Sequence, residues 1–157
     1  MKVVRILVIM LAAALAAPVI AQDKGNANME ILRQKVKADK KLVVAENMQL
    51  SDAEAKAFWP VYEAYQKDLD KINARLVEVI KTYADAYKKG AVPNDVASKL
   101  LDEALAIEEA ETKLKRSYVP KLNKALPAAK TARYMQIENK IRALVNMELA
   151  ANIPLVQ

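Results

Sequence analysis

Apolar residues recur every three to four positions along most of the chain, and the longest such series lies between residues 58 and 86. Its members are Phe58, Tyr62, Tyr65, Leu69, Ile72, Leu76, Val79, Tyr83 and Ala86. The steps alternate between four and three residues, which is the heptad repeat of a helix that packs along one face. The pattern therefore predicts one long helix with coiled-coil character.

The same helix carries signals at both of its ends. Ser51 is a residue type that caps helix starts, and Glu54, three residues later, completes a capping-box pattern. At the other end, Lys88 and Lys89 suit the negative end of a helix, and Gly90 suits the position just beyond it. We predict that this helix begins at Ser51 and ends near Gly90.

Three further helices follow from the same periodicity. The first runs from about Asn28 to Glu46, the third from Pro93 to about Ala125, and the fourth from Pro127 to about Asn152. Only two glycines are present in the whole chain, which is unusual for a strand-rich protein with many turns. The prediction is an all-α fold of about four helices that forms a single helical domain over residues 29–157.

Two prolines, Pro60 and Pro120, lie inside the predicted long helices. An interior proline removes one backbone hydrogen bond and crowds the carbonyl four residues earlier, which costs about 3 kcal/mol in a straight helix. Two interpretations stay open: each proline separates two shorter helices, or each bends one continuous helix beside aromatic residues. The second interpretation predicts a concave helical layer, so the arrangement is either a bundle or an open cradle.

The first 21 residues have the pattern of a secretory signal peptide. Lys2 and Arg5 precede an apolar run of 12 residues, and the segment ends in Val19-Ile20-Ala21. We therefore expect residues 1–21 to be cleaved after Ala21 and the mature protein to be periplasmic. Residues 22–28, QDKGNAN, are polar and are expected to form a flexible leader.

The composition argues against an enzyme. The chain contains no histidine, which removes the usual general base and the commonest transition-metal ligand, and no cysteine, so it uses no disulfide. Carboxylates remain, but no calcium-loop pattern is present. We expect no catalytic residues, no metal site and no cofactor.

Charge is distributed unevenly along the chain, whose formal net charge is +6. Residues 22–112 carry a net charge of −3, whereas residues 113–157 carry +7. One interpretation is that acids at the start and bases at the end of the third helix complement its dipole. The other is a basic surface for an acidic partner, such as unfolded polypeptide or an anionic envelope surface. Nucleic acid is not an expected partner of an exported protein.

Four acidic residues fall within or beside apolar stripes: Asp39, Glu111, Glu138 and Glu148. A buried carboxylate without a partner is costly, so each is expected to find a cation or to reach solvent. Arg142, four residues after Glu138, is one available partner. Arg75, which lies beside the long heptad series, can reach across to another helix. We interpret these acids as members of structural ion pairs.

Two stretches of the chain resemble the Spy/CpxP-like periplasmic stress proteins, which carry an L-T-x-x-Q motif at helix starts. "LSDAEAKAFWPVYEAY" contains the motif as Leu50-Ser51-x-x-Glu54, and "LPAAKTARYMQIENKI" contains a second form, Leu126-Pro127-x-x-Lys130. The first form keeps the capping chemistry, whereas the second keeps neither the hydroxyl nor the amide. The stretch "RYMQIENKIRALVNMELAANIPLV" is similar to a group of uncharacterised exported helical proteins of proteobacteria.

The Spy/CpxP-like resemblance implies long bent helices paired into a cradle-shaped dimer, and an ATP-independent chaperone role. On that basis we expect a non-enzymatic envelope-stress protein that binds unfolded or partner polypeptide on a surface with basic and apolar groups. The alternative is a scaffold or regulator-type protein that binds one folded partner at the envelope. The candidate binding surface consists of Trp59, Tyr62, Lys115, Arg116, Tyr118, Lys121 and Lys124.

The length of the heptad series bears on the oligomeric state. Four uninterrupted heptads on residues 58–86 offer more apolar stripe than a small monomer easily covers. We therefore expect a homodimer that forms through the long helices. A closed monomeric four-helix bundle would bury the same stripe internally and is the competing outcome.

Overall fold

The computed structural model describes residues 22–157, with side chains described from residue 34 onward. Its helices are α2 (Gln22–Met48), α3 (Asp52–Lys88), α4 (Asn94–Ala125) and α5 (Ala128–Asn152). Residues 22–157 contain no strand. The predicted all-α fold with about four helices is therefore confirmed. The expected signal peptide and its cleavage after Ala21 lie outside the described residues.

The helix ends agree with the sequence signals except at the start of α2. The predicted boundaries of α3, α4 and α5 are correct to within one or two residues. In contrast, α2 begins at Gln22, six residues before the predicted start at Asn28, so the expected leader 22–28 is helical. A single glycine and no proline occur in that segment, so no residue in it stops a helix.

The chain divides into two compact units, which are described separately. One unit contains α2 up to Gln49 together with residues 132–154, and the other contains Leu50–Thr131 together with Leu155–Gln157. The expectation of one domain over residues 29–157 stays a prediction. None of the helices in residues 22–157 combines the length and apolarity of a bilayer-spanning segment.

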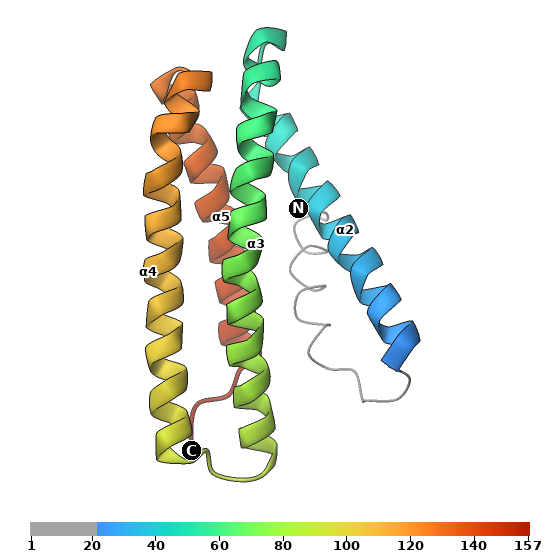
Figure 1. Cartoon of the computed structure of the whole chain (residues 1–157), viewed down its shortest axis with the longest axis vertical. Coiled ribbons are helices and arrows are strands. Elements are labelled where there is room, and N and C mark those ends of the chain that lie inside the picture. The colour runs from blue at the N-terminus through green and yellow to red at the C-terminus, as the bar shows by residue number, and fades with distance from the viewer. Residues whose placement is uncertain (1–21) are drawn as a thin grey trace. The chain divides into compact units, whose positions relative to one another are not determined.

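In the second unit, α3 and α4 form a long antiparallel hairpin (Figure 1). The two helices lie side by side over most of their length, and residues 89–93 connect them. Gly90 occupies this connection with a φ of 121°, a conformation that glycine adopts without steric cost. Its amide donates to the Tyr87 carbonyl oxygen at 3.1 Å, which closes the last turn of α3.

The heptad series of α3 is buried over its first half only. The buried members are Phe58, Tyr62, Tyr65, Leu69 and Ile72, and α4 contributes Ile107, Tyr118 and Leu122. Beyond Ile72 the predicted positions become half-buried, and Ile80 is buried instead. Ile80 lies eleven residues after Leu69, which is close to three full turns of an α-helix, so it returns to nearly the same side of α3 as Leu69.

Both prolines lie within continuous helices, so the interpretation that each separates two shorter helices is wrong. Pro60 and Pro120 are both exposed. The carbonyls that lose their intrahelical donors belong to Lys56 and Arg116, which are also exposed. Water can therefore bind these carbonyls, which lowers the cost of an interior proline. The curvature expected from the prolines stays a prediction.

The first unit contains an ion pair with one deeply buried member. Lys40 of α2 binds Glu138 of α5 at 2.8 Å, and Glu138 is 4 % exposed. This identifies a partner for Glu138 that the sequence did not indicate. Val44 and Met48, four residues apart on α2, are fully buried, as is Tyr134 on α5.

Candidate functional site

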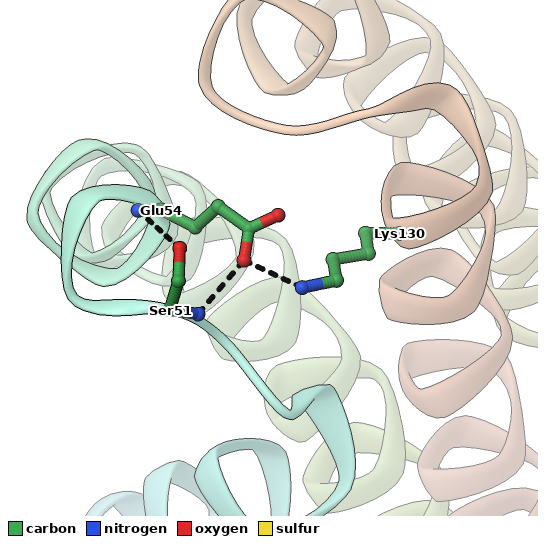
Figure 2. A network of polar contacts seen from close by, with 3 residues as sticks. All are labelled: Ser51, Glu54 and Lys130. Atoms are coloured by element: carbon green, nitrogen blue, oxygen red, sulfur yellow. Dashed lines mark hydrogen bonds and ion pairs between the residues drawn. The ribbon is translucent and has the colours of Figure 1, made fainter.

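The first family-like motif forms the start of α3 (Figure 2). Ser51 has the extended backbone of a capping residue, with φ −70° and ψ 165°. The Glu54 amide donates to Ser51 Oγ at 3.4 Å, and the Ser51 amide donates to Glu54 Oε2 at 2.8 Å. The predicted capping box is therefore present, and it satisfies two amides that a helix start would otherwise leave unpaired.

The second family-like motif meets the first one in the same unit. Figure 2 shows Lys130, in the first turn of α5, with its Nζ directed at Glu54 Oε2, and the two groups form an ion pair. The Pro127 carbonyl accepts the Lys130 amide at 2.9 Å and so orders that turn. Leu126 is buried and Leu50 is half-buried. Lys130 of the second motif thus binds Glu54 of the first motif.

These contacts make Glu54 a structural anion. The hydrogen bond from Lys130 is the main cause that holds the pKa of Glu54 below its usual value, and the hydrogen bond from the Ser51 amide adds to it. A carboxylate held ionised by a lysine and an amide is a poor proton acceptor at neutral pH. The pair of Glu54 and Lys130 links the start of α3 to the start of α5, and the two residues are 76 positions apart in the sequence.

The tyrosines of the candidate binding surface lie in the core of the hairpin. Tyr62 is 4 % exposed and Tyr118 is 3 % exposed, whereas Trp59 is half-buried. Tyr118 packs edge-on against Tyr65, with 5.3 Å between ring centroids. Its hydroxyl donates to Asp68 Oδ2 at 2.7 Å. Neither tyrosine can line an exposed surface in this structure, so the aromatic part of that surface reduces to Trp59.

Burial and the bond to Asp68 change the acidity of Tyr118. Desolvation is the main cause that raises the pKa of the Tyr118 hydroxyl to about 12, and the hydrogen bond to the Asp68 carboxylate acts in the same direction. The hydrogen bond from Lys71 is the main cause that lowers the pKa of Asp68, and the bond from Tyr118 adds to it. Tyr118 therefore stays protonated at physiological pH and acts as a hydrogen-bond donor.

The cations of the candidate surface fall into two groups. Lys115 forms an ion pair with Glu111 at 2.9 Å, and Lys121 Nζ lies 4.1 Å from the centroid of the Tyr118 ring. Arg116 and Lys124 are exposed on α4. Arg116, Lys121 and Lys124 are thus exposed on the second half of α4, whereas Lys115 is half-buried and paired within the same helix.

Two contacts of the hairpin were partly or wholly missed by sequence reasoning. Arg75 Nε donates to Glu103 Oε1 at 2.8 Å across α3 and α4, which confirms that Arg75 reaches another helix but adds Glu103 as its partner. The pair lines a shallow cavity of about 410 Å³, together with Val79 and Leu100. Asp68 has no local sequence signal of its role, because a single carboxylate in a charged helix does not indicate a partner 50 residues away.

The site contains no group of side chains with obvious ligand-binding chemistry. Among the described side chains, no three acidic, histidine or cysteine residues gather closely enough to hold a metal ion. No protein-family model, no curated protein and no solved structure matches the chain. Its function must therefore be argued from its own surface.

Proposed function

We propose that this is a non-enzymatic, periplasmic helical protein that binds unfolded or partially folded polypeptide without ATP, as a chaperone-like envelope-stress accessory. The observation that carries the proposal is the cationic second half of α4. Arg116 and Lys124 are exposed there, and Lys121 lies over the Tyr118 ring. The half-buried Trp59 lies at the same end of the antiparallel hairpin, away from its connecting loop.

This surface suits a chain without fixed structure. Unfolded polypeptides expose carboxylates and apolar side chains together, and clustered cations attract the former over a distance of about 10 Å at moderate salt. An indole ring offers apolar contact area with few rotatable bonds. Because no deep pocket is required, such binding would be weak and tolerant of sequence. The same cations would also permit weak contact with an anionic envelope surface.

An aggregation assay tests the proposal. Several unrelated client proteins are denatured and diluted with the mature chain, Gln22–Gln157, at a near-stoichiometric ratio in the absence of ATP, and light scattering follows their aggregation. We expect delayed or reduced scattering for most clients. A failure to protect any client, combined with capture of one folded envelope protein, would instead support the scaffold alternative.

Charge variants identify the surface that acts. Lys121→Glu with Lys124→Glu should reduce protection and its dependence on salt, because both cations lie at the proposed surface. The matched control is Lys88→Glu with Lys89→Glu, which changes the net charge equally at exposed positions near the connecting loop. Trp59→Ala tests the apolar component. An equal loss of client protection in both charge variants would indicate that binding depends on net charge alone. That result would refute a role for this surface.

A further inference from the structure

The outer face of α4 is exposed along most of the helix. Leu101 is 61 % exposed and Leu105 is 52 % exposed, and these two residues lie one turn apart. Thr112 and Val119 continue the same face at intervals of seven residues, Thr112 being exposed and Val119 half-buried. The face therefore has the spacing of a second helix-packing seam that no element of the hairpin covers.

Exposed charges on α4 change sign at Thr112. Asp102, Glu108 and Glu109 precede it, whereas Lys113 and Arg116 follow it, and Lys124 extends the cationic half. Lys99 is the exception in the acidic half. The helix dipole does not explain this division, because its effect falls off within the first and last turns. Glu109 and Lys113 lie in the middle of a helix of 32 residues.

From this pattern we infer that two copies of the chain associate through the outer faces of α4, antiparallel about a two-fold axis near Thr112. An antiparallel pair places the acidic half of each helix on the basic half of the other, whereas a parallel pair would place like charges together. With Thr112 opposite Thr112, Leu105 lies opposite Val119 of the second copy. Glu108 then lies opposite Arg116 of the second copy.

The length of the seam limits the strength of this association. From Leu101 to Val119 the helix extends about 27 Å at 1.5 Å per residue, so the contact is at the small end of specific interfaces. We expect a dissociation constant in the micromolar range and a marked weakening in salt, since the charges remain near solvent. This interface differs from the one expected on α3, where Phe58 to Ile72 are already buried within the chain.

The inference shares Arg116 with the proposed client-binding surface, but the two can be tested separately, because the client test changes Lys121 and Lys124. At 100° per residue, Lys121 lies about 160° around α4 from both exposed leucines, and its Nζ lies over the buried Tyr118 ring. A dimer through the outer face therefore leaves the Lys121 side of the helix accessible. Failure of the aggregation assay would not affect the dimer, and a monomeric protein could still protect clients.

Two charge-reversal variants test the antiparallel pairing. Glu108→Lys with Glu109→Lys makes both halves of α4 basic, and Lys113→Glu with Arg116→Glu makes both halves acidic. Sedimentation velocity at low salt should show a dimer for the wild type and at least a tenfold weaker dissociation constant for each variant alone. An equimolar mixture of the two variants should recover the dimer, because each supplies the charge that the other lacks.

Matched controls separate the interface from net charge and from folding. Glu78→Lys with Asp85→Lys, and Lys88→Glu with Lys89→Glu, make the same changes in net charge at exposed positions of the hairpin outside α4. Both controls should remain dimeric, and circular dichroism should show unchanged helix content in all variants. A monomeric wild type at 100 μM or above, a dimer that survives both reversals, or a mixture that stays monomeric would each overturn the inference.

Discussion

The two halves of the α3–α4 hairpin share one sequence pattern but differ in how deeply they bury it. In the half far from the loop, the heptad positions from Phe58 to Ile72 are buried. In the half near the loop, Leu76 and Val79 are only half-buried. A shallow cavity opens there beside the Arg75–Glu103 pair.

The difference comes from what stands opposite the seam. Tyr118 of α4 packs against Tyr65 and fills the far half with an aromatic ring. Near the loop, the α4 residues that line the cavity are Leu100 and the charged Glu103. A heptad series therefore identifies a helix face but does not fix how much of that face is removed from water. The far half is expected to hold the hairpin together, and the near half to tolerate change.

The largest expected effect compares two leucines one heptad apart. Leu69→Ala should destabilise the protein by about 2–5 kcal/mol, because Leu69 is 5 % exposed and its loss leaves a cavity. Leu76→Ala should cost about 1 kcal/mol or less, since the half-buried site loses less apolar contact. Chemical denaturation of both variants measures the two costs. Equal costs would mean that the two halves are packed equally well.

Pro60→Ala tests the far half from its exposed side. The substitution returns an amide donor to the Lys56 carbonyl within a continuous helix, and alanine is favoured over proline there by up to about 3 kcal/mol. Part of this gain is offset by the greater freedom of the unfolded chain. We expect stability to rise by about 1–2 kcal/mol in thermal unfolding.

The same variant also tests whether curvature serves binding. If Pro60 bends α3 and the bend shapes the client surface, client protection should fall while stability rises. Unchanged protection in a more stable variant would show that the bend has no role in binding. A loss of stability would show that the proline is favourable in its native surroundings, and the curvature argument would fail.

Contacts within a few residues could be predicted from the sequence, whereas the partners of contacts between helices could not. The capping box at Ser51 and Glu54 and the ends of α3, α4 and α5 were predicted, because they depend on neighbouring residues. The ion pair of Glu54 with Lys130 joins residues 76 positions apart, and periodicity contains no information on such a pair. Sequence reasoning therefore found both motifs but not that they meet.

The burial of Tyr118 shows the same limit at a single residue. Its neighbours in the sequence, Arg116 and Lys121, are exposed cations, which favoured a place on a binding surface. Only the position of α3 decides which side of α4 faces the core, and there Asp68 accepts the hydroxyl. In the sequence, a tyrosine at a heptad position beside basic residues is compatible with both the core and the exposed side of the helix. The position of the partner helix decides between them.

Tyr118→Phe should have a smaller effect than Leu69→Ala, about 1 kcal/mol, because it removes one hydrogen bond but keeps the ring. Because its folded pKa, about 12, is above the ordinary value of 10.0, the Tyr118 hydroxyl stabilises the fold below pH 10. That contribution is lost as the pH rises from 10 to about 12. Denaturation between pH 7 and 12 should therefore show a smaller alkaline decline for Tyr118→Phe than for the wild type.

The smallest expected effect concerns the charge of Glu54, which Glu54→Gln removes while a side-chain oxygen remains for the capping box. Because the folded pKa of Glu54 is lowered, its charge stabilises the fold above the ordinary value of 4.5, and this contribution is lost as the pH falls through the lower folded value. Wild type and variant should therefore differ slightly at pH 7 and converge once the pH falls below the lowered folded pKa of Glu54. Glu103→Gln is the matched control near the loop, where the Arg75 and Glu103 side chains are 41 % and 42 % exposed, compared with 29 % and 20 % for Lys130 and Glu54. Solvent screens the more exposed pair more strongly. Glu103→Gln should therefore change the loss of stability at acidic pH less than Glu54→Gln does. A gap between wild type and Glu54→Gln that persists at pH 2 would show that the amide disturbs the cap itself, and that the ion pair with Lys130 is not what the substitution removes.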